Sequence, residues 1–135
     1  MAATGCLRQL SFAYLDMNWY GKKDHDDSIE AFESKVLDKL AILPKIEGTT
    51  ISCCFSHIFA GGYSAGYYSY KWAEVLSSDA YSLFEEEGIF NPTTGQKFLN
   101  EVLERGGEED AAVLFKNFRG REPRTEALLR HSGIK

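Results

Sequence analysis

Residues 64–88 read SAGYYSYKWAEVLSSDAYSLFEEEG, and this stretch sets the fold class. Its apolar residues recur at intervals of three and four, which places them along one side of a helix. They are Tyr67, Tyr70, Val75, Leu76, Ala80, Leu83 and Phe84. Gly88 comes directly after them and is typical of the residue that follows a helix C-terminus. We therefore predict one long helix from about Ser64 to Glu87.

Three more helices are predicted downstream of this one. Asn91 with Pro92 is typical of an N-cap and first helical residue, and Asp110 and Thr125 open the next two segments. Glycines close the three segments, and these are Gly106, Gly120 and Gly133. The side chains predicted to face inward are Phe98, Leu99, Val102, Leu103, Leu114, Phe115, Phe118, Leu128 and Leu129.

Two helices are predicted upstream. The first ends at residues 19–21 and carries one apolar face, formed by Leu7, Leu10, Tyr14 and Met17. The second follows Asp26 or Asp27 as N-cap and stops at residues 43–44, with an apolar stripe of Ile29, Phe32, Val36 and Leu40. Residues 45–54 favour an extended loop. The fold is therefore predicted as all-α, a single helical domain over residues 1–135 with about six helices and one Gly-rich central loop.

Composition and charge exclude several classes of protein. The chain has 44% apolar and 26% charged residues, which argues against disorder over its whole length. A net charge of −5 gives no positive field for nucleic acid. No apolar run is long enough to cross a membrane, and no signal peptide is recognised at the start. Cys6, Cys53 and Cys54 lack the spacing of a disulfide framework or zinc ribbon, so we expect a reducing cytoplasm.

The carboxylate of Asp79 interrupts the apolar face of the long helix. We expect it to pair with a basic residue that the sequence does not identify. Arg119, Arg121 and Arg124 cluster in the segment FRGREPR, at residues 118–124. Structural ion pairing is the favoured interpretation of this cluster, and binding of a substrate carboxylate is the alternative.

Residues 55–72, FSHIFAGGYSAGYYSYKW, carry the chemistry. If the helix begins near Tyr63, then Tyr63, Tyr67 and Tyr70 share one face. A neutral phenol keeps its proton at neutral pH and can donate a hydrogen bond to an oxygen that becomes negative during a reaction. A core or subunit surface of tyrosines is the alternative interpretation of this spacing.

His57 and two glycines precede the tyrosines. His57 could donate a second hydrogen bond or orient a substrate, and a purely structural histidine is the alternative. Gly61 and Gly62 each cost about 1 kcal/mol in a helix relative to alanine. They therefore predict a loop that bends, approaches a bound ligand closely and closes over it.

The stretch from residue 55 onward, FSHIFAGGYSAGYYSYKWAEVLSSDAYSLFEEEGIFN, resembles the C-terminal region of the thimet-oligopeptidase family, most closely its bacterial oligopeptidase A branch. The similarity continues through NPTTGQKFLNEVLERGG and LFKNFRGREPRTEALLRHSGIK to residue 135. It also includes LRQLSFAYLDM, which looks like the preceding helix, whereas residues 21–54 resemble the family only loosely. The resemblance implies a piece of a larger, two-lobed, zincin-like helical peptidase that hydrolyses short peptides.

The resemblance also implies roles for individual residues. His57 corresponds to the family's transition-state-stabilising histidine, and Tyr70 to the tyrosine best suited to donate to an oxyanion. Tyr63 and Tyr67 correspond to substrate-contacting tyrosines, and Gly61 and Gly62 to hinge glycines of the loop. Zinc is the cofactor that the family implies.

This chain has no HExxH, the motif in which two histidines one helical turn apart bind the metal. We expect that motif in an upstream part of the peptidase and predict no metal ligands here. The chain alone is expected to be inactive, to bind short peptides, and to self-associate through apolar surface. The alternatives are a non-catalytic helical peptide-binding or interaction module and one half of a split enzyme.

Overall fold

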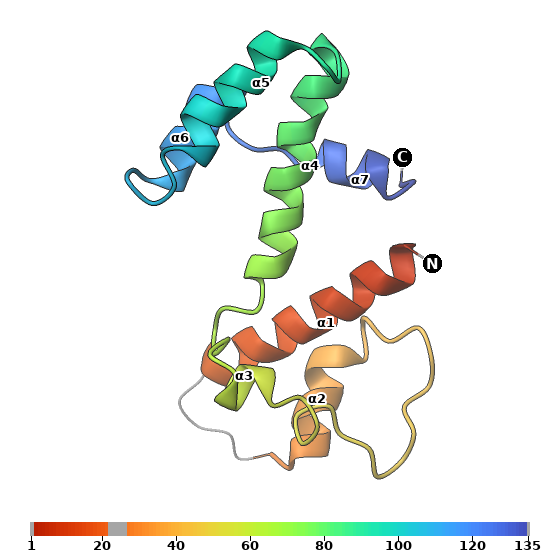
Figure 1. Cartoon of the computed structure of the whole chain (residues 1–135). Coiled ribbons are helices and arrows are strands. Elements are labelled where there is room, and N and C mark those ends of the chain that lie inside the picture. The colour runs from red at the N-terminus through yellow and green to blue at the C-terminus, as the bar shows by residue number, and fades with distance from the viewer. Residues whose placement is uncertain (1, 22–26, 135) are drawn as a thin grey trace. The chain divides into compact units, whose positions relative to one another are not determined.

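The computed structural model describes residues 2–21 and 27–134, and every regular element among them is helical (Figure 1). This confirms the all-α prediction. The elements are α1 (Ala2–Gly21), α2 (Ile29–Leu37), α3 (His57–Ala60), α4 (Ser69–Glu87), α5 (Pro92–Phe98), a π-helical turn η1 (Leu99–Leu103), α6 (Ala111–Arg119) and α7 (Glu126–His131). The one α-helix beyond the predicted six, among these residues, is the single-turn α3. No helix in this part of the chain is long and apolar enough to cross a bilayer.

The described residues divide into two compact units, Met1–Lys71 and Trp72–Lys135. Each unit has buried apolar side chains of its own. The single domain predicted over residues 1–135 stays a prediction.

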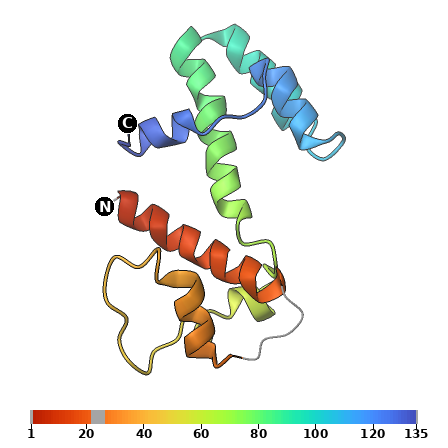
Figure 2. The same cartoon turned by 180° about the vertical axis from the view of Figure 1, so that it is seen from behind.

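In the first unit, α1 crosses α2 and α3 lies near the C-terminal end of α1 (Figures 1 and 2). The core of this unit consists of Ala13, Leu15, Phe32, Ile58 and Tyr67. The predicted apolar face of α1 is not the buried one, since the side chains of Tyr14 and Met17 are 53% and 46% exposed. Phe12 and Trp19 pack against the core instead. The helix has apolar residues on more than one side, so periodicity alone could not select the buried side.

Helix α2 begins and ends differently from the prediction. Its N-cap is Ser28, whose hydroxyl accepts a hydrogen bond from the N–H of Ala31 at 3.2 Å. Asp27 instead forms an ion pair with Lys35 at 2.6 Å, and Asp26 lies outside the described residues. The helix ends at Leu37, six residues before the predicted stop at residues 43–44. Residues 45–54 form neither helix nor strand, as predicted for a loop.

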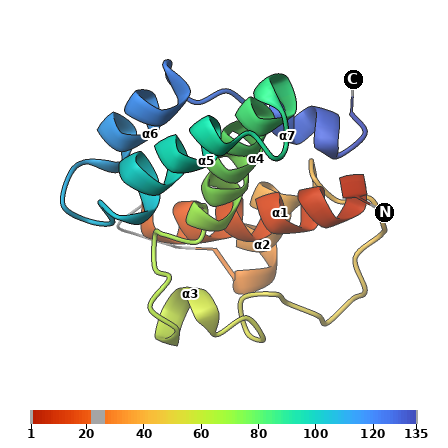
Figure 3. The same cartoon turned by 45° about the horizontal axis from the view of Figure 1, so that its top comes forward.

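In the second unit, the predicted helices and caps at Asn91 and Asp110 are confirmed. Leu99, Leu103 and Leu129, which were predicted to face inward, are instead 36%, 61% and 40% exposed. The side chains of Asn91 and Asp110 cap α5 and α6 by accepting from Thr93 N at 3.0 Å and Ala112 N at 2.8 Å. Figure 3 shows α5 and α6 side by side. Their contact uses an aromatic trio, in which the ring of Phe98 lies 5.2 Å from that of Phe118 and 5.9 Å from that of Phe84.

Asp79 is the buried charge of this unit, with 1% of the residue exposed. The guanidinium of Arg121 donates two hydrogen bonds to its carboxylate, at 2.6 and 2.7 Å, and the N–H of Arg124 donates a third at 2.8 Å. These contacts join α4 to the segment that leads into α7. Arg121 and Arg119 therefore form structural ion pairs with Asp79, as the favoured interpretation predicted, whereas Arg124 contributes its backbone N–H. Arg121 is the main partner that the sequence could not name.

Candidate functional site

Helix α4 starts at Ser69 rather than near Ser64, because residues 64–68 form a turn. The N–H of Gly66 donates to the carbonyl of Tyr63 at 2.8 Å. Ala65 has φ 54°, in the left-handed region that a residue with a Cβ rarely adopts. Tyr63 and Tyr67 therefore precede the helix, and the predicted shared helix face does not exist.

The turn nevertheless brings the three tyrosines together. Their ring centroids lie 5.2 Å apart for Tyr67 and Tyr70, 5.5 Å for Tyr63 and Tyr70, and 6.0 Å for Tyr63 and Tyr67. The hydroxyl of Tyr70 donates to the hydroxyl of Tyr63 at 2.7 Å. Tyr70 is 45% exposed, whereas Tyr67 is only 8% exposed. The phenols of Tyr70 and Tyr63 are thus the pair held at the edge of the core.

The pKa of Tyr70 is raised above its ordinary value of 10.0. The hydrogen bond to Tyr63 is the main cause, because it stabilises the protonated donor, and partial desolvation and the neighbouring phenols add to it. Tyr70 therefore holds its proton at neutral pH and remains a hydrogen-bond donor.

His57 is the first residue of α3, and its imidazole belongs to an aromatic stack. Its ring lies 4.7 Å from the ring of Phe55 at an interplanar angle of 20°, and Phe55 in turn stacks on Phe12 at 4.3 Å. The imidazole also lies 6.0 Å from the ring of Tyr63. The side chain of His57 is exposed, so the stack fixes the ring while solvent can still reach it.

Gly61 and Gly62 are required for two different reasons. A Cβ on Gly61 would lie 2.8 Å from both the Cα and the carbonyl oxygen of His57, closer than atoms can approach. Gly62 has φ +80° and open space around it, so its backbone conformation is what favours glycine. The carbonyl of His57 accepts from Gly61 N at 3.2 Å and from Tyr63 N at 3.3 Å. The glycines thereby fold the chain so that His57 and Tyr63 become neighbours.

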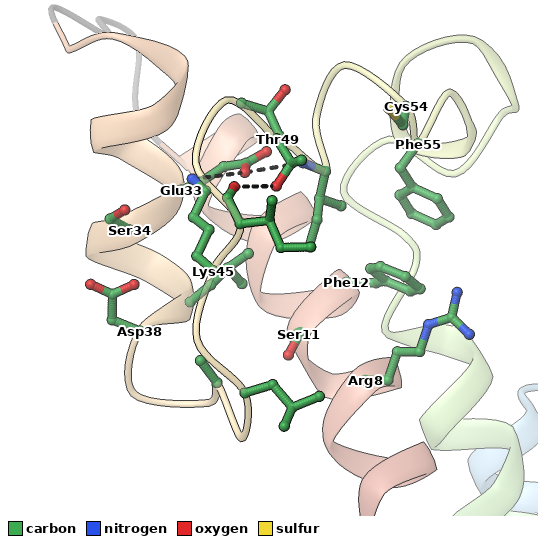
Figure 4. Close-up of a pocket in the computed structure, with 16 residues that line it drawn as sticks. Arg8, Ser11, Phe12, Glu33, Ser34, Asp38, Lys45, Thr49, Cys54 and Phe55 are labelled. Carbon is green, nitrogen blue, oxygen red and sulfur yellow. Dashed lines mark hydrogen bonds and ion pairs between the residues drawn. The ribbon is translucent and has the colours of Figure 1, made fainter.

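A pocket of about 550 Å³ opens between α1, α2 and the loop that follows α2 (Figure 4). Phe12 and Phe55 form part of its wall, and the guanidinium of Arg8 lies 5.4 Å from the centre of the Phe12 ring. None of the predicted site residues lines this pocket. Phe55 connects this pocket with the predicted site, because it lines the pocket and also stacks on His57.

The sequence analysis did not single out four residues that shape this region: Phe12, Phe55, Asp16 and Glu33. Asp16 and Glu33 are 0% and 2% exposed, and both carboxylates accept hydrogen bonds from backbone N–H groups. A usable signal existed for Asp16, since it is a lone carboxylate within the apolar run FAYLDM, as Asp79 is within the long helix.

Within residues 2–21 and 27–134, no three His, Cys, Asp or Glu side chains gather as ligands for a metal ion. The imidazole of His57 packs against aromatic rings instead. By themselves, these residues do not fit a zinc site.

Comparison with known proteins identifies a class of hydrolase, the peptidases. The model of peptidase family M3 matches residues 1–134, and the chain belongs to that family. The chain is 53% identical over 135 residues to oligopeptidase A of Haemophilus influenzae, covering 98% of this chain and 20% of that protein. It is 49% identical over 136 residues to oligopeptidase A of Escherichia coli, covering 99% of this chain and 20% of the relative.

A more distant relative is the dipeptidyl carboxypeptidase of Escherichia coli, which is 37% identical over 128 residues, or 93% of this chain and 19% of that protein. The chain thus spans about a fifth of the length of the curated relatives that it matches.

Proposed function

We propose that this chain is a wall segment of an oligopeptidase catalytic site, which supplies hydrogen-bond donors for the hydrolysis of short peptides. The observation that carries the proposal is the bond between the hydroxyls of Tyr70 and Tyr63, at 2.7 Å on a partly exposed surface beside His57. Membership of peptidase family M3 supports the reaction class.

The proposed chemistry depends on which of the two phenols donates the hydrogen bond between them. Without a substrate, Tyr70 donates its single proton to the neutral hydroxyl of Tyr63, and in the proposal this proton turns to the oxyanion, which is the stronger acceptor, when that charge forms. When water adds to an amide carbonyl, the oxygen becomes negative, and a neutral donor that is already in place stabilises that charge. The raised pKa of Tyr70 keeps it protonated throughout this step. In the proposal, Tyr70 and His57 donate to the oxyanion, and Tyr63 orients Tyr70 and contacts the peptide.

The remaining predicted residues act as the frame of this site. Tyr67 packs its ring edge-on against Phe55 at 5.1 Å, so its proposed substrate contact is limited to the exposed part of the phenol. Gly61 and Gly62 allow the chain to turn between His57 and Tyr63, and in the proposal they also let a peptide backbone approach closely.

The proposed partner is the part of the peptidase that carries HExxH. In the family resemblance, that part holds the zinc ion, and it is proposed to supply the metal ligands. The chain alone is therefore proposed to be inactive, although it can bind short peptides. Its three cysteines are free, which is compatible with a reducing cytoplasm as the proposed location.

The test exchanges the matched fifth of Escherichia coli oligopeptidase A for this chain and follows cleavage of a short internally quenched peptide. We expect the chimaera to be active and this chain alone to be inactive. In the chimaera, Tyr70→Phe should lower kcat about 10²–10³-fold with little change in KM, because the lost bond acts on the transition state. Tyr68→Phe, at an exposed phenol, is the matched control.

An active chimaera whose kcat is the same with Tyr70→Phe would contradict the proposed role of the phenol. An inactive chimaera, together with peptide binding by this chain, would favour the alternative of a non-catalytic peptide-binding module. Activity restored by mixing this chain with a separately expressed HExxH-bearing part would identify a split enzyme.

A further inference from the structure

The turn that carries the tyrosines is held by a carboxylate from another helix. Asp16 of α1 is 0% exposed. Its Oδ1 accepts from the N–H of Ala65 at 2.9 Å, and its Oδ2 accepts from the N–H of Tyr67 at 2.9 Å. Removing a carboxylate from water is costly unless hydrogen bonds compensate it, so each oxygen receives a donor. These donors lie 49 and 51 residues from Asp16 in the sequence.

The same turn contains a backbone conformation that needs support. Ala65 has φ 54°, which costs about 1–2 kcal/mol for a residue with a Cβ. The two hydrogen bonds to Asp16 lie on either side of Gly66 and fix this conformation. Because an α-helix cannot pass through a left-handed residue, the turn stops α4 from extending back to residue 64. That interruption is what places Tyr63 against Tyr70.

A second carboxylate holds the segment that leads into His57. Glu33 of α2 is 2% exposed and accepts from the N–H groups of Ile51, at 3.1 Å, and Ser52, at 2.5 Å. The carbonyl of Ile51 then accepts from the N–H of Phe55 at 2.8 Å, and Phe55 stacks on His57. The side chain of Lys45 lies 3.7 Å from Glu33 and is the nearby positive charge.

We propose that Asp16 and Glu33 are positioning residues that hold the two sides of the His57–Tyr70 segment in its working geometry. Asp16 sets the turn that pairs Tyr63 with Tyr70, and Glu33 sets the stack that orients His57. The inference rests on the proposed function, because Asp16 and Glu33 can affect kcat only if His57 and Tyr70 take part in the reaction. Donors fixed before the oxygen becomes negative need no rearrangement during the reaction, which is the benefit of such a frame.

The test uses Asp16→Asn and Glu33→Gln, which keep the side-chain size but put an N–H₂ donor against a backbone N–H donor. Amide hydrogen exchange, followed by NMR on the 135-residue chain, reports separately on the backbone N–H groups that donate to Asp16 and on those that donate to Glu33. Asp16→Asn should speed exchange at Ala65 and Tyr67 about tenfold or more and leave Ser52 unchanged, and Glu33→Gln should do the reverse. Glu47→Gln, at an exposed carboxylate, is the control for both.

In the chimaeric enzyme, each variant should lower kcat about tenfold or more and change KM less than twofold, because orientation matters most in the transition state. Ala65→Gly supplies a second measurement. Glycine adopts positive φ at little cost, so the kcat loss caused by Asp16→Asn should be smaller in an Ala65→Gly background. This background also serves if Asp16→Asn alone does not fold.

Unchanged amide exchange at Ala65 and Tyr67 in Asp16→Asn would show that Asp16 does not hold this turn. Faster exchange with unchanged kcat, in a chimaera that Tyr70→Phe does impair, would overturn the positioning role and leave the proposed function standing. An unchanged kcat in Tyr70→Phe contradicts the proposed function instead, and the exchange measurement on the chain is independent of that result.

Discussion

The hydroxyl of Tyr70 donates to the hydroxyl of Tyr63 across 2.7 Å, and this bond spans the turn that separates the two residues. It is the main cause of the raised pKa of Tyr70. Because the bond stabilises the protonated phenol, its contribution to folding is complete below the unfolded pKa of about 10 and is lost as the pH rises through the higher folded value. The pair is therefore expected to function at neutral pH and to open in alkali.

Removing the acceptor should lower the pKa of its donor. In Tyr63→Phe, the hydroxyl of Tyr70 loses its partner, so its pKa should move down toward the ordinary value. NMR of the tyrosine Cζ carbons resolves the individual titrations. Tyr68→Phe removes an exposed phenol that makes no described contact with Tyr70 and should leave the pKa of Tyr70 unchanged. A Tyr70 titration that is identical in Tyr63→Phe would mean that the bond does not form in solution.

Gly61→Ala should destabilise the first unit by about 1–3 kcal/mol, because its Cβ would meet the backbone of His57 at 2.8 Å and backbone cannot easily give way. Urea unfolding followed by circular dichroism measures the change. Gly5→Ala is the matched control. Gly5 lies in α1 with no atom within 4 Å of a new Cβ, so alanine should be neutral or stabilise by up to about 1 kcal/mol. Equal effects of the two substitutions would contradict the steric argument.

Asp79→Asn should destabilise the second unit by about 3 kcal/mol at pH 7, since it removes a buried carboxylate and leaves the partly buried guanidinium of Arg121 without its partner. Urea unfolding with near-ultraviolet detection measures this loss. Asp110→Asn, at an exposed N-cap where asparagine also serves, should change stability far less.

The pH dependence of the same pair has a defined sign. Burial acts to raise the pKa of Asp79, but the hydrogen bonds from Arg121 and from the N–H of Arg124 outweigh it, and the pKa is lowered. The pair therefore stabilises the fold fully above the unfolded pKa of about 3.9, and this stability is lost as the pH falls through the folded pKa. Between pH 7 and pH 2, the free energy of unfolding should fall more with decreasing pH in the native chain than in Asp79→Asn. An equal pH dependence in the two chains would show that the ion pair contributes nothing to acid stability.

Local signals predicted most of the second unit. Asn91 and Asp110 cap their helices through their own side chains, and Gly120 adopts φ 79° directly after α6, so short-range chemistry was sufficient there. The predicted start of α4 was wrong for a different reason. The turn before it depends on Asp16, which is 49 residues from Ala65, and no local pattern reports a contact at that distance.

The same limit applies to the candidate site. The sequence identified His57, Tyr63 and Tyr70, and the structure brings their rings together, but through a turn instead of a helix face. The stack of His57 on Phe55 depends on long-range packing against Phe12, which spacing alone could not predict.

Self-association of the chain is the last prediction, and it follows from apolar side chains that face solvent. Phe90 is 96% exposed in the second unit, and Leu43 is 79% exposed in the first. Burying a side chain of this size against another copy contributes about 1.5–3 kcal/mol, which favours association at high concentration. Sedimentation equilibrium should therefore show oligomers, and Phe90→Ser and Leu43→Ser should each weaken them if the corresponding unit supplies the contact. Thr93→Ser, at an exposed polar position, is the control, and a monomer throughout the concentration series would refute the prediction.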